Sequence, residues 1–195
     1  MYPESRCSLD HEDPLQLLLA TVLSAQCTDA RVNQVTPALF ARYPDAEALA
    51  TADPTEVEEA IRSVNYYRTK ARALISIGAA LQERHGGAVP RSMEELTALS
   101  GVGRKTANVV RGVAFGDADG VVVDTHVKRV AKRLGLTAHT VPERVEKDLL
   151  PLIPPAERVV FTHRVIDHGR AICLARTPLC AVCGLAELCP SARVV

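Results

Sequence analysis

The sequence has 195 residues, of which 47% are hydrophobic and 24% charged, and its formal net charge is zero. These values are ordinary for a globular protein and exclude intrinsic disorder and collagen-like sequence. No run of about 18 apolar residues is present, which excludes a membrane span, and the first residues lack the apolar core of a signal peptide. We therefore expect a cytoplasmic protein whose cysteines stay reduced.

The charge is distributed unevenly along the chain. Residues 1–60 carry 3 basic and 11 acidic side chains, whereas residues 61–195 carry 20 basic and 12 acidic ones. A chain polarised in this way can present one basic face to a polyanion such as nucleic acid. The alternative is that the two parts interleave in space and the asymmetry averages out.

Helical signals follow one another along nearly the whole chain. Pro37 is expected to kink or split the helix that contains it, and residues 121–123 form an extended connector with no strand partner. We therefore predict an all-α fold. Helices are predicted after the cap residues Asp13, Asp29, Asp53, Ser92 and Asp124, and over residues 68–85, 104–115, 142–150 and 155–172.

Four of the six cysteines lie close together near the C-terminus, at Cys173, Cys180, Cys183 and Cys189, with the spacing C-x6-C-x2-C-x5-C. Four thiolates in one short loop can close around a metal centre, and disulfides are disfavoured in a reducing compartment. Zinc suits four cysteines, but structural zinc sites usually pair two tight knuckles and only one is present. The spacing leaves zinc open and favours an iron–sulfur cluster, whose ligands lie farther apart.

A second motif joins two short helices through a turn that contains Gly101 and Gly103. Glycine lets a backbone approach a phosphate closely, and the amides of a helix N-terminus can donate to it. This is the helix–hairpin–helix pattern, which contacts DNA through its backbone without reading sequence. The alternative is an ordinary helical hairpin with a glycine turn.

Lys105 follows Arg104 at the start of the second helix of this hairpin. A lysine is a nucleophile only in its neutral form, and both the positive end of a helix and an adjacent cation disfavour the charged form. We interpret Lys105 as a candidate Schiff-base lysine; a surface lysine that touches phosphate is the simpler alternative. Asp124 is explained well as a helix cap, and it can also serve as a base beside a reactive amine.

Five segments together carry a resemblance to a known family: residues 23–29, 99–110, 123–127 and 168–170, and the four-cysteine tail. They resemble the endonuclease III family of bifunctional DNA glycosylases, and the resemblance covers nearly the whole chain. It implies a [4Fe–4S] cluster on the four cysteines. It also implies a six-helix barrel domain over residues 14–117 and a cluster domain of residues 1–13 with 118–195.

The activity implied by the resemblance is the removal of oxidised pyrimidines from double-stranded DNA, by a nucleoid-associated monomer that also acts at abasic sites. Lys105 would attack C1′ of the deoxyribose, expel the damaged base and permit strand cleavage by β-elimination. Asp124 would assist deprotonation of the lysine and stabilise the developing cation. The lesion would be flipped out of the stack.

The resemblance also implies contacts with DNA. Gln26 matches a residue that fills the hole left by the flipped base, and Tyr66 stands where many members carry a leucine wedge. Ser24 and Asp29 would line the lesion pocket, while the hairpin residues Gly101, Gly103 and Arg104, together with Arg176 in the cysteine loop, would contact the backbone.

Five positions depart from the pattern of the family and indicate altered damage recognition or a slower enzyme: Asn65, Tyr66, Thr97, Ser100 and Leu179. Two other activities fit part of the same sequence. An adenine-type monofunctional glycosylase shares the hairpin and cluster but lacks a lysine at position 105. A non-catalytic iron–sulfur protein that binds DNA would need no Schiff-base lysine.

Overall fold

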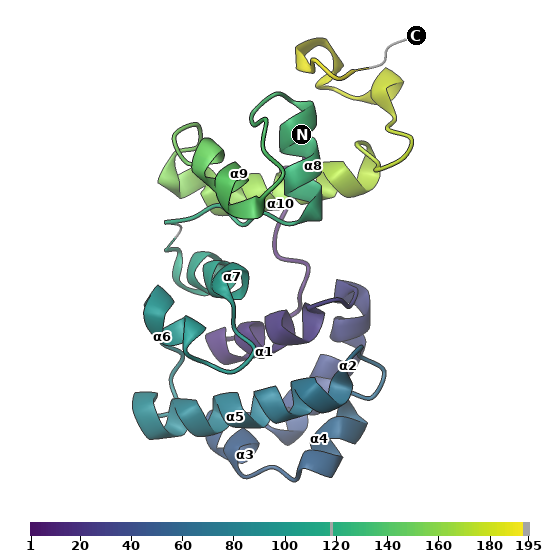
Figure 1. The fold of residues 1–195 in the computed structure, drawn as a ribbon. Helices are drawn as coiled ribbons and strands as arrows, with labels where there is room; N and C mark the ends of the chain where they lie inside the picture. Colours follow the sequence, from purple (N-terminus) through teal and green to yellow (C-terminus); the bar gives the residue numbers. More distant parts are fainter. Residues whose placement is uncertain (118, 193–195) are drawn as a thin grey trace. The chain divides into compact units, whose positions relative to one another are not determined.

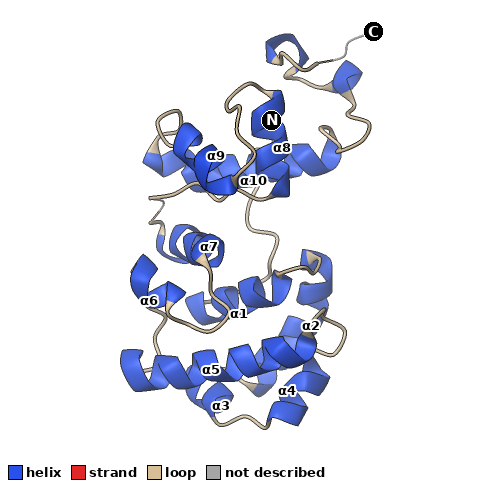
Figure 2. Cartoon of the chain, viewed as in Figure 1, coloured by secondary structure: helices blue, strands red, loops and turns tan. Residues whose placement is uncertain are grey.

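The computed structural model describes residues 1–117 and 119–192 (Figure 1). Every regular element in that part of the chain is a helix (Figure 2), which confirms the predicted all-α class. The structure forms two compact units. The first unit is Ser8–Asp117, and the second consists of Met1–Cys7 together with the described residues that follow Asp117. No helix of the described residues is long and apolar enough to cross a membrane.

The unit formed by Ser8–Asp117 contains seven helices within the described residues: α1 (Pro14–Ser24), α2 (Asp29–Arg42), α3 (Ala46–Ala50), α4 (Pro54–Ala60), α5 (Tyr67–His85), α6 (Met93–Thr97) and α7 (Arg104–Phe115). The other unit contains α8 (Thr125–Arg133), α9 (Pro142–Leu149) and α10 (Arg158–Ala171), with three short 3-10 turns at Pro155–Glu157, Cys180–Val182 and Ala186–Leu188.

Helix α1 is the centre of the first unit. Its residues from Leu17 to Leu23 are buried without interruption, and the helix packs against α2, α5 and α7. Each fully buried leucine contributes about 1.5–3 kcal/mol relative to exposure. The elements that surround α1 are therefore held to it mainly by apolar burial.

Helix caps confirm most of the predicted starts. The carboxylates or hydroxyls of Asp13, Asp53, Ser92 and Asp124 each accept a hydrogen bond from a backbone amide in the first turn. The predicted cap at Asp29 was wrong: Thr28 is the N-cap and accepts from the amide of Arg31, so Asp29 is the first helical residue. Helix α2 is not split at Pro37 but continues through it to Arg42.

The second unit has its own apolar core, built where α8 packs against α10. Val121 and Val123, from the extended connector, lie in this core beside Val127 of α8 and Val165 of α10. The connector is extended, as predicted, and its valines are explained by burial and not by pairing with another strand.

The N-terminal boundary between the units differs from the prediction. Residues 8–13 were assigned to the second unit, but they group with the helices of the first. The side chain of Asn33 accounts for this, because its Nδ2 donates to the carbonyl of Ser8 and its Oδ1 accepts from the amide of Asp10. Residues 2–7 are instead bonded to α10: the hydroxyl of Ser5 donates to Asp167, 2.6 Å away.

Gly78 marks a close contact between helices α3 and α5 of the first unit. A Cβ atom at this position would lie 2.8 Å from the amide nitrogen of Ala50 and 2.9 Å from the carbonyl oxygen of Ala46. Both atoms belong to the backbone of α3, so they cannot rotate away. The absence of a side chain at Gly78 is what lets α3 lie against α5.

Replacing Gly78 by alanine tests this contact. Alanine favours a helix by roughly 0.8–1.0 kcal/mol over glycine, yet we expect Gly78→Ala to lower the free energy of unfolding by about 1–3 kcal/mol because the packing must open. Urea unfolding measures the change. The control is Ser76→Ala, an exposed position of the same helix, which should be neutral or slightly stabilising. A Gly78→Ala protein as stable as the control would contradict the close-packing argument.

Candidate active site and cysteine site

The predicted hairpin is formed by α6, the turn that follows it, and α7. Gly101 has a φ of +74°, a backbone conformation that residues with a Cβ atom rarely adopt. Val102 is buried between the two glycines. Gly103 is the N-cap residue of α7, and a Cβ added there would meet no described atom within 4 Å. The backbone at Gly103 is therefore open on this side, beside the first amides of α7.

Arg104 and Lys105 are the first two residues of α7, and both are exposed. The amides of the first turn of a helix have no partner within the helix and carry partial positive charge. The structure thus places a lysine side chain, an arginine side chain and the first amide groups of α7 at one helix end. This arrangement suits a phosphate backbone, and it exposes the amine of Lys105.

Asp124 is the N-cap residue of α8, in the other unit. Its Oδ1 accepts a hydrogen bond of 2.8 Å from the amide of Val127, and the residue is half-buried. The structure therefore confirms the cap function. Since this bond uses one carboxylate oxygen, the geometry is compatible with a second function for the other oxygen.

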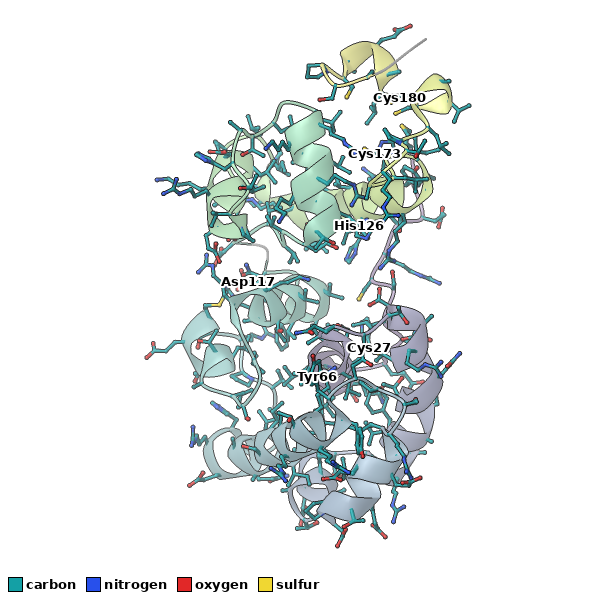
Figure 3. All side chains as sticks on the ribbon, turned by 45° about the vertical axis from the view of Figure 1, so that its right-hand side comes forward. Cys27, Tyr66, Asp117, His126, Cys173 and Cys180 are labelled. Carbon is teal, nitrogen blue, oxygen red and sulfur yellow. The ribbon has the colours of Figure 1, made fainter. Side chains whose placement is uncertain are left out.

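The four C-terminal cysteines line one cavity of the second unit. None of them forms a disulfide, and each is half-buried. Within the described residues, no three His, Cys, Asp or Glu side chains are grouped so as to hold a single metal ion. Cys173 and Cys180 are labelled in Figure 3. Apolar side chains complete the wall, among them Val130, Leu134, Ile172, Pro178 and Leu179.

Two arginines of α8 hold the start of the cysteine loop. Arg133 donates through Nη1 to the carbonyl of Leu174 (2.6 Å) and to Sγ of Cys173 (3.3 Å), and through Nη2 to the carbonyl of Ala175. Arg129 donates to the carbonyl of Cys173 from Nε. Sequence patterns gave no indication of these bonds, because they join residues about 40 positions apart.

His168 also lines this cavity. Its Nε2 is 3.7 Å from Sγ of Cys183, and its Nδ1 is 3.4 Å from the hydroxyl of Tyr2. Burial lowers the pKa of His168 below the ordinary histidine value, so the ring is neutral at pH 7.

Gly169, the next residue, lies where α10 contacts α8. A Cβ atom at Gly169 would lie 3.0 Å from the side chain of His126, which explains why this close contact requires glycine.

Two further predicted DNA-contacting residues, Gln26 and Tyr66, share an unusual backbone. Gln26 has a φ of +55° and Tyr66 a φ of +59°, the left-handed region that costs non-glycine residues about 1–2 kcal/mol. Both side chains are exposed, Tyr66 to 65%. Gln26 lies in the turn between α1 and α2, and Tyr66 directly precedes α5.

Lys70 and Asn65 connect these two turns, and no sequence motif pointed to Lys70. Lys70 is 7% exposed; its Nζ donates to the carbonyls of Leu23 (2.8 Å) and Ala25 (2.6 Å). Burial lowers the pKa of Lys70 below its ordinary value. The side-chain amide of Asn65 donates to the carbonyl of Gln26 at 2.7 Å.

The remaining predicted site residues lie in both units. Ser24 ends α1, and its hydroxyl donates to the carbonyl of Thr21. Asp29 begins α2 in the same unit. Arg176 is exposed in the loop between Cys173 and Cys180 of the other unit.

Comparison with known proteins assigns the chain to a family. Residues 19–155 match the family described as "HhH-GPD superfamily base excision DNA repair protein". The chain is 56% identical over 193 residues to endonuclease III of Synechocystis sp., covering 99% of this chain and 88% of that protein. It is 46% identical over 191 residues to endonuclease III of Bacillus subtilis, covering 97% and 86%.

The chain belongs to the endonuclease III family. Among solved structures, it is similar to a trapped endonuclease III–DNA covalent intermediate, with a TM-score of 0.90, 46% sequence identity, and coverage of 98% of this chain and 90% of that chain. Members of the endonuclease III family are base excision repair glycosylases with lyase activity. This supports the enzymatic interpretation of the hairpin over the non-catalytic alternative.

The cap function of Asp124 leads to a test of stability. Asp124→Ala should lower the free energy of unfolding by about 1 kcal/mol, because the amide of Val127 loses its acceptor. Asp124→Asn keeps an acceptor oxygen at the same position and should cost less than half as much. Chemical denaturation of both variants gives the comparison; equal losses would show that the cap does not act through this acceptor.

Proposed function

We propose that this chain excises oxidised pyrimidines from duplex DNA and cleaves the strand at abasic sites through a Schiff base on Lys105, acting as a monomer. One observation carries the proposal. An exposed lysine stands at the second position of α7, directly after the Gly101–Gly103 turn, in a chain that is 46% identical to a protein trapped covalently on DNA.

The amine of Lys105 forms the first new bond. In its neutral form it attacks C1′ of the sugar, and the bond between C1′ and the damaged base breaks, so the base leaves with the electron pair. The nitrogen lone pair then expels the ring oxygen O4′, which takes the electron pair of the C1′–O4′ bond and a proton, and the opened sugar is left as an iminium ion whose C2′ proton is acidic. Loss of that proton breaks the C3′–O bond, and hydrolysis of the imine then regenerates the amine.

Asp124 supports this chemistry as a carboxylate. It accepts the proton that Lys105 must lose before attack, and its charge stabilises the positive sugar as the base departs. The bond from the amide of Val127 fixes the orientation of the Asp124 carboxylate within its own unit.

DNA binding uses the hairpin and the cysteine loop. The exposed backbone at Gly103, the first amides of α7 and the side chain of Arg104 suit phosphate oxygens. Arg176 adds a cation from the loop that follows Cys173. These contacts are independent of sequence, as an enzyme that inspects any duplex for damage requires.

The four cysteines fit a [4Fe–4S] cluster, which we propose as the resident cofactor. They line one apolar cavity without disulfides, and Arg133 donates to Sγ of Cys173, a bond that favours the thiolate. When bound, the cluster cross-links four points of the C-terminal segment. Its place in this proposal is to hold the loop that carries Arg176.

The spread of the cysteines favours a cluster over zinc. Four thiolates around one zinc lie roughly 3.8 Å apart, as tetrahedral geometry with Zn–S of about 2.3 Å requires. Among the four cysteines, which line one cavity, the sequence contains a single tight C-x2-C pair, Cys180 with Cys183. A cubane, whose irons each take one thiolate, suits wider separation.

The nucleophile is tested by Lys105→Gln. Borohydride should trap a covalent adduct between the wild-type protein and DNA that contains an oxidised pyrimidine, because it reduces the imine. Lys105→Gln should give neither adduct nor strand cleavage while it still binds DNA. Lys147→Gln, an exposed lysine on α9, serves as the control and should behave like the wild type. An adduct that persists in Lys105→Gln would remove Lys105 from this step.

The cofactor is tested by metal content. Purified protein should be brown and hold about four irons per chain. Cys173→Ser should lose most of this iron, and Cys27→Ser should keep it, since Cys27 lies in the other unit. A folded, colourless protein with one zinc per chain would contradict the assignment.

The contribution of Arg176 is tested by the salt dependence of DNA binding. Each phosphate contact contributes about −0.9 to the slope of log K against log salt concentration, so Arg176→Ala should make the slope shallower by about that amount. Arg84→Ala, at the far end of the 19-residue α5 from Tyr66, should leave the slope unchanged. The same slope for both variants would place Arg176 away from the DNA backbone.

A further inference from the structure

Two neighbouring turns of the first unit expose one side chain each from a left-handed backbone. They carry Gln26 and Tyr66 (Figure 3 labels Tyr66 and Cys27, the residue after Gln26). Isolated residues of these types seldom hold this conformation, so something in the surrounding structure must maintain it.

Three side-chain hydrogen bonds join the turns. Asn65, directly before Tyr66, donates to the carbonyl of Gln26 itself at 2.7 Å. The ammonium group of Lys70 donates to the carbonyl of Ala25, directly before Gln26, and to that of Leu23. The backbone amide of Lys70 also donates to the carbonyl of Tyr66 at 3.0 Å. The residues on both sides of Tyr66 thus hold the turn that carries Gln26.

We propose that Asn65 and Lys70 are positioning residues that fix Gln26 and Tyr66 as a paired probe of the DNA duplex before DNA binds. The inference rests on the proposed function and on the DNA contacts that the family resemblance implies, in which Gln26 fills the space of the flipped base and Tyr66 takes the place of the leucine wedge. It adds that the two act as one rigid device and identifies the side chains that join them.

Rigidity matters for the energetics of base flipping. A wedge that must order itself on binding loses part of its interaction energy to conformational entropy, whereas a pre-ordered wedge does not. Asn65 and Tyr66 are adjacent, and both stand at positions where the sequence departs from the family pattern; the tyrosine replaces a leucine wedge. The amide of Asn65 thus joins the altered wedge to the turn that carries Gln26.

Asn65 is the residue on which the proposal can be tested cleanly. Lys70 is buried and bonds to the end of α1, so its removal threatens the fold. Asn65 is exposed, and its side-chain amide donates to the turn of Gln26. A matched control is Asn33→Ala, because Asn33 also bonds to backbone groups of a neighbouring turn in the same unit, at Ser8 and Asp10.

The experiment compares two substrates. Asn65→Ala should slow cleavage of a well-paired oxidised pyrimidine by about 10-fold, the order expected when a positioned group is displaced slightly. It should slow cleavage at an abasic site, where no base must be flipped, by less than about 2-fold on the same principle. Asn33→Ala should slow both equally or not at all. Equal slowing of the two substrates by Asn65→Ala would overturn the proposal.

A double-mutant cycle shows whether Asn65 acts through the probe. In a Tyr66→Ala, Gln26→Ala background, Asn65→Ala should have no further effect on the ratio of the two rates. An undiminished effect in that background would overturn the proposal.

A readout that does not need cleavage separates this inference from the proposed function. Fluorescence of 2-aminopurine placed opposite the lesion should rise when wild-type protein binds and rise less with Asn65→Ala. If Tyr66→Ala and Gln26→Ala leave both the fluorescence and the rate ratio unchanged, the DNA contacts of the proposed function fail, and the inference with them. If those variants lower both but Asn65→Ala lowers neither, only the inference fails.

Discussion

Burial of helix α1 is the constraint on which much of the first unit depends. Because its residues from Leu17 to Leu23 have no exposed side, the last carbonyls of the helix end inside protein, where unpaired polar groups are costly. The ammonium group of Lys70 donates a hydrogen bond to the carbonyl oxygen of Leu23, which is one of these buried groups. In doing so it joins the start of α5 to the end of α1 and places the turns of Gln26 and Tyr66 beside each other.

In the proposed function, the two units contribute different residues. The first presents the glycine turn, where a Cβ atom at Gly101 would lie 3.6 Å from Val22 of α1, and this packing sets the start of α7 and Lys105. The second presents Asp124 at the start of α8. The same helix carries Arg129 and Arg133, which hold the cysteine loop. Helix α8 thereby connects the carboxylate to the cysteine site within one rigid element.

Local patterns predicted much of this structure because they depend on residues close together in the sequence. A cap such as Ser92 with Glu95, or the glycine turn before Lys105, is determined within a few positions. The functions of Lys70, Asn65, Asn33 and Arg133 could not be found in this way, since their partners lie 23 to 47 positions away. The prediction that Asp29 caps α2 was wrong for another reason. Aspartate and threonine both favour the N-cap position, so only the backbone geometry shows that Thr28 is the cap.

The central claim is that the amine of Lys105 forms the covalent bond to DNA. Peptide mapping of the borohydride-reduced adduct by mass spectrometry tests it most directly, because the sugar remains attached to whichever amine attacked. The account predicts that the modified peptide carries the sugar on Lys105. A sugar on the N-terminal amine, or on the buried Lys70, whose pKa is lowered by burial, would contradict it.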